Sequence, residues 1–139
     1  MAGLPPLSDV LEEYQLVDGE DRYRLLIDLG QQLEAMPDVL KTEATKVRGC
    51  SASVWVYPTA RDGRLHFLAD SNAAITKGIV ALILSAVQDK PAAEIAQMDV
   101  REALGPFELR KHLSANRTQG VPNMIALVRE TAERYAAAV

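Results

Sequence analysis

The sequence predicts an α+β fold in which helices pack on one face of a small antiparallel β-sheet of about three strands. Two short runs rich in β-branched and aromatic residues, 53–57 and 65–69, flank an Asp62-Gly63 turn, which is typical of an antiparallel hairpin. Much of the remaining chain carries apolar residues at helical spacing. Because a two-stranded ribbon is only marginally stable, the hairpin requires a further strand and covering helices.

Two helices are expected ahead of the hairpin. The first covers 7–16 and the second about 20–33, where Asp18 is placed to act as the N-cap. Apolar side chains of the second helix share one face: Tyr23, Leu26, Ile27, Gly30 and Leu33. Pro37 ends this helical region, because proline lacks the N–H group that a continuing helix needs.

The sheet is expected to centre on the hairpin. Residues 58–63 form the turn between its two strands, with Asp62-Gly63 as the sharpest part of that turn. A third strand is expected near 45–47, since the hairpin needs another partner.

A long helix is expected directly after the hairpin, with Asp70-Ser71-Asn72 supplying its N-cap. Its broad apolar stripe comprises Ile75, Ile79, Leu82, Ile83, Ala86 and Val87. The sequence Asp89-Lys90-Pro91 then stops the helix.

Two short helices and one long terminal helix complete the chain. The short helices cover 91–97 and 100–104, and Asp99 caps the second of them. The terminal helix starts near Val121 or is kinked there, because Pro122 is tolerated in the first turn of a helix and not in its interior. Its apolar face comprises Met124, Ile125, Val128, Ala132 and Tyr135.

Length and composition limit the classes of function. A chain of 139 residues without a linker or repeat is expected to form one domain, 1–139. Its formal net charge of −4 argues against nucleic acid as a partner, because phosphate binding requires a basic surface. The longest apolar stretch, 78–87, is too short to span a membrane. With no recognisable secretory signal and one unpaired cysteine, a cytoplasmic location is expected.

The one cysteine, Cys50, is the leading candidate for chemistry. A lone thiol forms no internal disulfide and offers too few ligands for a structural zinc site. Gly49 and Ser51 on either side indicate a turn, and the cations Lys46 and Arg48 just upstream would favour the nucleophilic thiolate. Two interpretations remain open at this point: a reactive thiol on a loop, or an inert thiol buried as a small hydrophobic group.

Other candidate groups favour structural interpretations. His66 lies in a strand and His112 near a helix end, and no spacing supports a catalytic pair of either with Cys50. Lys77-Gly78 lies inside a helix without the glycines of a phosphate-binding loop. Carboxylates fall on polar helix faces, as do Glu12, Glu13, Asp28 and Glu34.

Several motifs occur together along nearly the whole chain. They are Leu29-Gly30-Gln31-Gln32-Leu33, Val47-Arg48-Gly49-Cys50 with Val54-Trp55, Asp70-Ser71-Asn72-Ala73-Ala74-Ile75 with Lys77-Gly78, and His112-Leu113-Ser114 with Arg117 and Gln119-Gly120. Through this combination the chain resembles the SufE family of cysteine desulfuration proteins.

The resemblance implies a fold similar to that of the iron–sulfur scaffold protein IscU and a function in iron–sulfur cluster assembly. It implies that Cys50 accepts persulfide sulfur from a SufS- or CsdA-type cysteine desulfurase, stimulates that enzyme, and passes the sulfur to a SufBCD-type cluster scaffold. The pyridoxal phosphate (PLP) belongs to the desulfurase, and no cofactor or metal is expected on this chain. The chain therefore resembles a sulfur carrier that acts with an enzyme more than a stand-alone enzyme.

Three further residues are implicated near the sulfur. Gly49 removes side-chain bulk beside Cys50, which would help the thiol enter a partner's cleft, although a plain turn glycine explains it equally. Arg48 is the cation next to that glycine. Arg117 matches a family arginine and would either support the Cys50 loop or contact the desulfurase, although a surface arginine of a first helical turn explains it equally. Asn72 and Pro122 depart from the family pattern.

Three other functions compete with sulfur transfer. An iron–sulfur scaffold would need about three cysteines or equivalent ligands, and this chain has one cysteine. A cysteine hydrolase would need a histidine base and an oxyanion hole beside Cys50, and the sequence indicates neither. An allosteric activator of a desulfurase that accepts no sulfur is compatible with the sequence.

Overall fold

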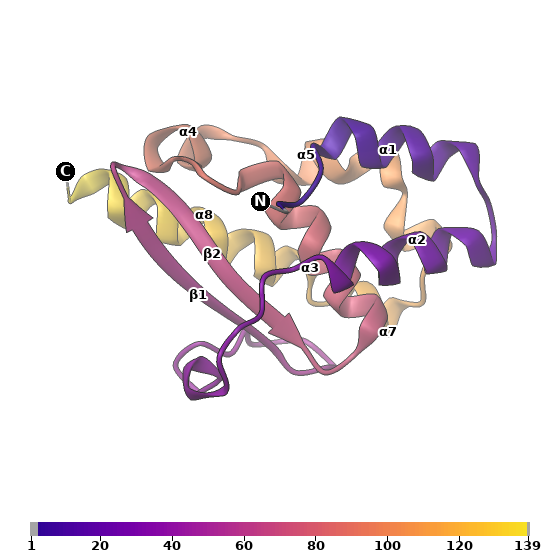
Figure 1. Cartoon of the computed structure of the whole chain (residues 1–139), viewed down its shortest axis with the longest axis horizontal. Coiled ribbons are helices and arrows are strands. Elements are labelled where there is room, and N and C mark those ends of the chain that lie inside the picture. The colour runs from indigo at the N-terminus through magenta and orange to yellow at the C-terminus, as the bar shows by residue number, and fades with distance from the viewer. Residues whose placement is uncertain (1–2, 139) are drawn as a thin grey trace.

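The computed structural model describes residues 3–138, and it confirms an α+β fold with a three-stranded antiparallel sheet (Figure 1). The strands are β1 (Val54–Arg61), β2 (Arg64–Ser71) and β3 (Lys90–Pro91), in the order β1-β2-β3. The helices are α1 (Leu7–Leu16), α2 (Glu20–Gln31), α3 (Ala74–Val87), α4 (Ala92–Gln97), α5 (Val100–Leu104), α6 (Leu109–His112), α7 (Ala115–Thr118) and α8 (Val121–Ala137). Short 3₁₀ turns, η1 and η2, occupy Asp38–Leu40 and Gly105–Phe107.

The hairpin is longer than predicted, because Pro58 lies inside strand β1 and not in the turn. Pro58 pairs with Phe67 in the register of β1 against β2. Two residues earlier, the N–H of Val56 points away from β2 and donates to Thr45 O at 2.8 Å. The missing N–H of Pro58 therefore faces the open edge of β1, where proline interrupts no pairing with β2. Asp62 and Gly63 form the predicted turn, now confirmed, with φ of 56° and 77°.

The third strand of the sheet lies elsewhere than predicted. It is the two-residue β3, which pairs with the start of β2 through Leu65 and Lys90. The predicted segment does approach the opposite edge, where Lys46 and Trp55 form an isolated β-bridge. This contact is a single bridge and not a strand, because the chain turns away into the Cys50 loop immediately afterwards.

One face of the hairpin is buried. Alternate residues of the two strands point into the core: Val54, Val56, Leu65, Phe67, Ala69 and Ser71. In Figure 1, α8 runs behind the hairpin and α3 lies beside it, so the covering helices are on one side. Among the described residues, none of the helices is long and apolar enough to cross a membrane.

Helix α3 is the centre of the core. Its sequence predicts an apolar stripe, yet nearly every residue from Thr76 to Val87 is buried, because α1, α2, α5, α7, α8 and β2 all contact it. Helix α2 crosses α3 where two glycines meet. A β-carbon on Gly78 would overlap the carbonyl group of Leu26, and one on Gly30 would lie 2.9 Å from Gly78 N. Only residues without side chains allow the two backbones to approach this closely.

Two of the predicted helix ends are confirmed and one is wrong. Asp99 caps α5 as predicted, accepting a hydrogen bond from Glu102 N at 3.0 Å. Helix α8 begins at Val121 with Pro122 in its first turn, also as predicted. The expected cap of α2 by Asp18 is wrong, because Gly19, at φ 54°, precedes that helix and gives no side-chain cap.

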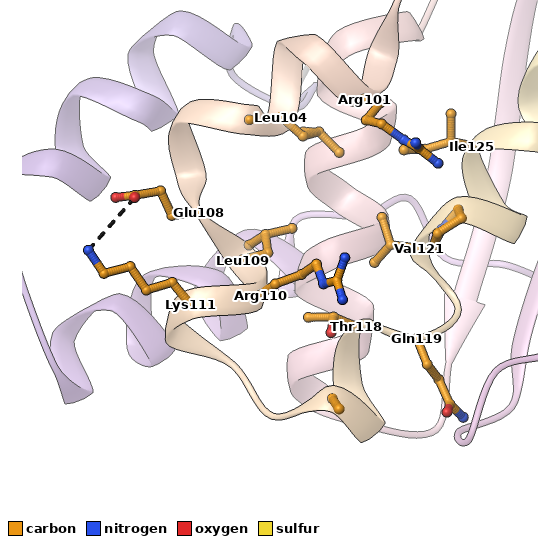
Figure 2. A pocket seen from close by; sticks show the side chains of 13 residues that line it. Arg101, Leu104, Glu108, Leu109, Arg110, Lys111, Thr118, Gln119, Val121 and Ile125 are labelled. Carbon is orange, nitrogen blue, oxygen red and sulfur yellow. Dashed lines mark ion pairs between the residues drawn. The ribbon is translucent and has the colours of Figure 1, made fainter.

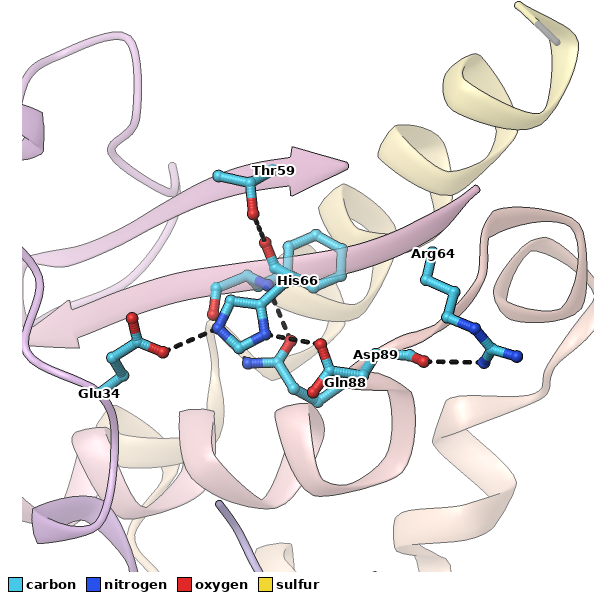
Figure 3. Close-up of polar contacts among 7 residues, drawn as sticks. Glu34, Thr59, Arg64, His66, Gln88 and Asp89 are labelled. Carbon is cyan, nitrogen blue, oxygen red and sulfur yellow. Dashed lines mark hydrogen bonds and ion pairs between the residues drawn. The ribbon is translucent and has the colours of Figure 1, made fainter. Parts of the chain in front are cut away.

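The outer face of β2 carries a histidine held between two carboxylates (Figure 3). His66 Nε2 lies 2.8 Å from Glu34 Oε1, and His66 Nδ1 lies 2.7 Å from Asp89 Oδ1. Partial burial by itself lowers the pKa of His66. The hydrogen bonds to Glu34 and Asp89 raise the pKa by a larger amount, so it lies above its ordinary value. The imidazole ring links the segment after α2, the hairpin and the turn before β3.

This raised pKa predicts a pH-dependent contribution to stability. The contribution of His66 should be fully present below the unfolded pKa of about 6.5 and should vanish as pH rises through the higher folded pKa. We expect the difference in unfolding free energy between the wild type and His66→Gln to fall by about 1 kcal/mol across that range, since the cluster is partly exposed. Urea denaturation of both proteins at several pH values measures this difference. A difference that stays constant with pH would contradict the prediction.

Candidate functional site

Cys50 lies at the centre of a loop that begins and ends at neighbouring points of the fold. Val47 N donates to Val54 O at 2.8 Å, which closes the base of the loop. Ser53 N donates to Asn72 Oδ1 at 3.1 Å, so the residue after strand β2 holds the second arm of the loop. The loop therefore projects from the end of the hairpin where β1 begins and β2 ends.

The start of helix α8 holds this loop on its other side. Asn123 Nδ2 donates to Arg48 O at 2.9 Å, and Gln119 Nε2 donates to Ser51 Oγ at 2.5 Å. Between these two hydrogen bonds, Cys50 Sγ lies 4.0 Å from the carbonyl oxygen of Gly120. We call Gln119, Gly120 and Asn123 the loop clamp.

Two glycines make the close contact between the loop and the clamp sterically feasible. Gly120 is buried and has ordinary helical dihedrals, φ −85° and ψ −7°, so backbone freedom is not the reason for glycine there. Instead, a β-carbon on Gly120 would overlap Cys50 Sγ and lie 3.1 Å from Cys50 Cα. Gly49 has φ 82°, which glycine adopts without strain, and its β-carbon position is occupied by the amide of Asn123.

The thiol is half-buried and packs against the edge of the hydrophobic core. Burial raises the pKa of the Cys50 thiol above its ordinary value. The expectation that Lys46 and Arg48 favour the thiolate is therefore wrong for the unbound chain: both side chains are exposed, and desolvation of the sulfur prevails. In this state Cys50 is a protected thiol more than an activated one.

The structure places the other predicted site residues at different distances from the sulfur. Gly49 and Arg48 adjoin Cys50 in the loop, and Arg48 contributes its backbone oxygen to the clamp while its side chain is exposed. Arg117 is exposed on α7, with its guanidinium 5.9 Å from the ring centroid of Tyr23 on α2. Within residues 3–138 no hydrogen bond joins Arg117 to the Cys50 loop, and its side chain contacts α2 instead.

Asp70 does not cap helix α3, contrary to the expected role of its motif. Ala73 precedes that helix, and Asp70 instead binds two lysines, Lys41 at 2.7 Å and Lys77 at 3.2 Å. Partial burial by itself raises the pKa of Asp70. Hydrogen bonds from Lys41, the Ser71 N–H and Lys77 lower the pKa by a larger amount, so it lies below its ordinary value. This ion cluster fastens the segment before β1 to the end of β2, next to the Cys50 loop.

Neither histidine serves as a base for Cys50. His66 binds Glu34 and Asp89, and His112 Nε2 lies 2.8 Å from Arg22 Nη1. The described part of the chain also contains no group of three His, Cys, Asp or Glu side chains placed to hold a metal ion.

The loop clamp was not assigned from the sequence. Gln119, Gly120 and Asn123 lie about 70 positions from Cys50, and none of them has a local pattern that indicates a contact with it. A glycine directly before a Val-Pro helix start is typical of an ordinary helix boundary. Only the arrangement of α7 and α8 against the hairpin brings these residues to the sulfur.

Fold and site together define an α+β protein that presents one half-buried thiol on a clamped loop. The chain belongs to the SufE family, because the family model "SufE: Fe-S metabolism associated domain" matches residues 8–132.

Relatives agree with this assignment. An uncharacterised SufE-like protein of Rhizobium meliloti (strain 1021) is 36% identical over 132 residues, covering 91% of this chain and 94% of that protein. The sulfur acceptor protein CsdE of Escherichia coli (strain K12) is 43% identical over 107 residues, covering 76% of this chain and 73% of that protein. The solution structure of a hypothetical protein from Thermus thermophilus has a TM-score of 0.76 at 14% identity, covering 97% of this chain and 99% of that one, which shows the shared fold alone.

Proposed function

We propose that this chain is a sulfur acceptor and carrier for iron–sulfur cluster assembly, and that Cys50 carries the sulfur as a persulfide. One observation supports this most directly: the lone thiol sits half-buried on a loop held by the clamp, with no base, second thiol or metal-binding group beside it in the described chain. Membership of the SufE family and similarity to a protein named as a sulfur acceptor support the same function.

The transfer step is an exchange at sulfur. The Cys50 thiolate attacks the terminal sulfur of a cysteine persulfide on the donor protein. A new S–S bond forms at Cys50 as the donor's S–S bond breaks, and the donor cysteine leaves as a thiolate that takes up the proton lost from Cys50. The sulfane sulfur moves without an external oxidant or reductant. Attack by an acceptor protein on the Cys50 persulfide later repeats this exchange and restores the thiol.

The state of the unbound chain fits a carrier. A buried, protonated thiol reacts slowly with stray electrophiles and oxidants, because the thiolate is the reactive form. The absence of a second cysteine in the sequence means that no internal thiol can displace the carried sulfur as sulfide. Loading then requires the donor protein to draw the loop away from Gly120, so reactivity is restricted to the docked complex.

The partners proposed here rest on membership of the SufE family together with the exchange chemistry. The donor is a cysteine desulfurase of the SufS or CsdA type, which holds its own PLP, and this chain binds no cofactor. Removing persulfide sulfur from the desulfurase frees its thiol for the next turnover, which explains stimulation of that enzyme. The recipient is a cluster scaffold of the SufBCD type. A free thiol requires a reducing compartment, and we place the cycle in the cytoplasm.

The mass of the intact protein tests this function. After incubation with an active cysteine desulfurase and free cysteine, without reductant, we expect the wild type to gain one or more sulfur atoms that dithiothreitol removes. Cys50→Ser should gain none, and the neighbouring control Ser53→Ala should gain as much as the wild type. If Cys50→Ser still stimulates the desulfurase and the wild type gains no sulfur, the chain is an activator that does not accept sulfur.

A further inference from the structure

A groove of about 780 Å³ lies next to the loop clamp (Figure 2). Helices α5 and α6 form one wall, and α7 with the start of α8 forms the other. Its volume is in the range of sites that bind ligands or peptide segments. Nothing in the sulfur chemistry of Cys50 accounts for it.

The groove combines an apolar floor with a cationic rim. Leu104, Leu109 and Ile125 contribute the apolar surface, and the guanidinium groups of Arg101 and Arg110 lie over it (Figure 2). Both arginine side chains are exposed, and neither forms a hydrogen bond or ion pair within residues 3–138.

The charge of the groove points to an anionic occupant. At one end, Lys111 is 3.8 Å from Glu108, and these two charges offset each other. The two arginines remain as uncompensated positive charge on a chain whose formal net charge is −4. Guanidinium groups bind carboxylates in a planar, two-pronged geometry, so they match an acidic segment that also carries apolar side chains.

The groove and the Cys50 loop share a wall. Gln119 lines the groove, and its side chain reaches toward the loop, where it donates to Ser51 Oγ (Figure 2). Val121 and Pro122, which start α8 directly after Gly120, line the groove as well. An occupant of the groove therefore contacts the same short segment that holds the thiol in place.

We propose that this groove is a docking site for an acidic, partly apolar surface segment of the sulfur-donating protein. The proposal rests on the function above. The donor is the partner that meets the unloaded chain, and in that state the thiol lies beneath Gly120 and must be released before attack. A segment seated in the groove holds the donor beside the clamp, whereas the later recipient meets a chain that already carries sulfur.

Charge reversal in the groove tests the proposal. The variant Arg101→Glu with Arg110→Glu should need about tenfold more desulfurase to reach half-maximal sulfur loading in a single turnover, with a similar rate at saturation, because exposed charges chiefly govern encounter. The matched control Arg24→Glu with Arg61→Glu changes the net charge equally on exposed sites outside the groove and should load like the wild type. The difference should shrink at high salt.

Two outcomes would overturn the docking site. One is a groove variant that loads with the same dependence on desulfurase concentration as the wild type. The other is normal loading combined with impaired delivery of sulfur to a scaffold, which would assign the groove to the recipient. Direct measurement of desulfurase affinity, by biolayer interferometry, separates this proposal from the function. If binding depends on the two arginines but the wild-type chain gains no sulfur after incubation with active desulfurase and cysteine, the groove would be retained and the carrier function rejected.

Discussion

Replacing Gly120 with alanine is expected to expose Cys50 and raise its alkylation rate by about tenfold. The added β-carbon would occupy the position of Cys50 Sγ and lie 3.1 Å from Cys50 Cα, so rotation of the cysteine side chain alone cannot relieve the overlap. Overpacking of this kind costs about 1–3 kcal/mol. That cost shifts the equilibrium of the Cys50 loop from the state held by the clamp toward the released state. A cost of about 1.4 kcal/mol increases the population of the released state tenfold.

The measurement is the rate of reaction of Cys50 with iodoacetamide at neutral pH, compared with a small-molecule thiol. The wild type should react more slowly than the free thiol, because burial raises the pKa of Cys50 and shields the sulfur. In the variant, a persulfide on Cys50 should also be lost faster to dithiothreitol.

Gly3→Ala is the control for this experiment. Gly3 is exposed, its φ lies outside the left-handed region, and no heavy atom beyond its chain neighbours lies within 4 Å of its β-carbon position. Its alkylation rate should equal that of the wild type. If Gly120→Ala keeps its fold and also reacts at the wild-type rate, then Gly120 does not hold the thiol in the way described.

Gly78→Ala is expected to destabilise the fold by about 3 kcal/mol, since the large effects of single substitutions come from clashes of this kind. In a free helix, alanine is more favourable than glycine by about 1 kcal/mol, so the opposite result would be due to tertiary structure. The β-carbon at position 78 would overlap the backbone carbonyl of Leu26, and backbone in the middle of α2 has no rotamer with which to move aside. Helices α2 and α3 would have to separate along their whole contact.

Thermal and urea denaturation followed by circular dichroism measure this loss. Gly3→Ala again serves as the control and should unfold at the wild-type midpoint, because its β-carbon would meet no other group. A Gly78→Ala variant as stable as the wild type would mean that α2 and α3 tolerate a wider separation than the structure has.

Most of the secondary structure could be predicted from short-range patterns. The Asp62-Gly63 turn, the start of α8 at Val121 and the cap at Asp99 all depend on the dihedral angles or hydrogen bonds of neighbouring residues. Short-range patterns predict Pro58 in the turn, whereas it lies in β1, because the effect of a proline depends on which side of the strand its nitrogen faces. That side is set by the pairing of β1 with β2 and with residue 45.

The third strand and the burial of α3 were not predictable in this way. Strand β3 has two residues and no pattern of its own, and it is a strand only because β2 lies beside it. Helix α3 has the sequence of a strongly apolar helix, but its burial on nearly all sides depends on how many other elements surround it.

The same distinction applies to the site. Sequence alone was enough to make Cys50 the candidate for sulfur chemistry, because the chain has one cysteine and places it in a turn beside Gly49. The direction of its pKa shift depends on the tertiary structure, since burial beneath a glycine 70 positions away raises the pKa of Cys50 despite the nearby Lys46 and Arg48. A residue type and its turn are local properties of the chain, whereas desolvation, close packing and the clamp on the loop arise only where distant segments meet.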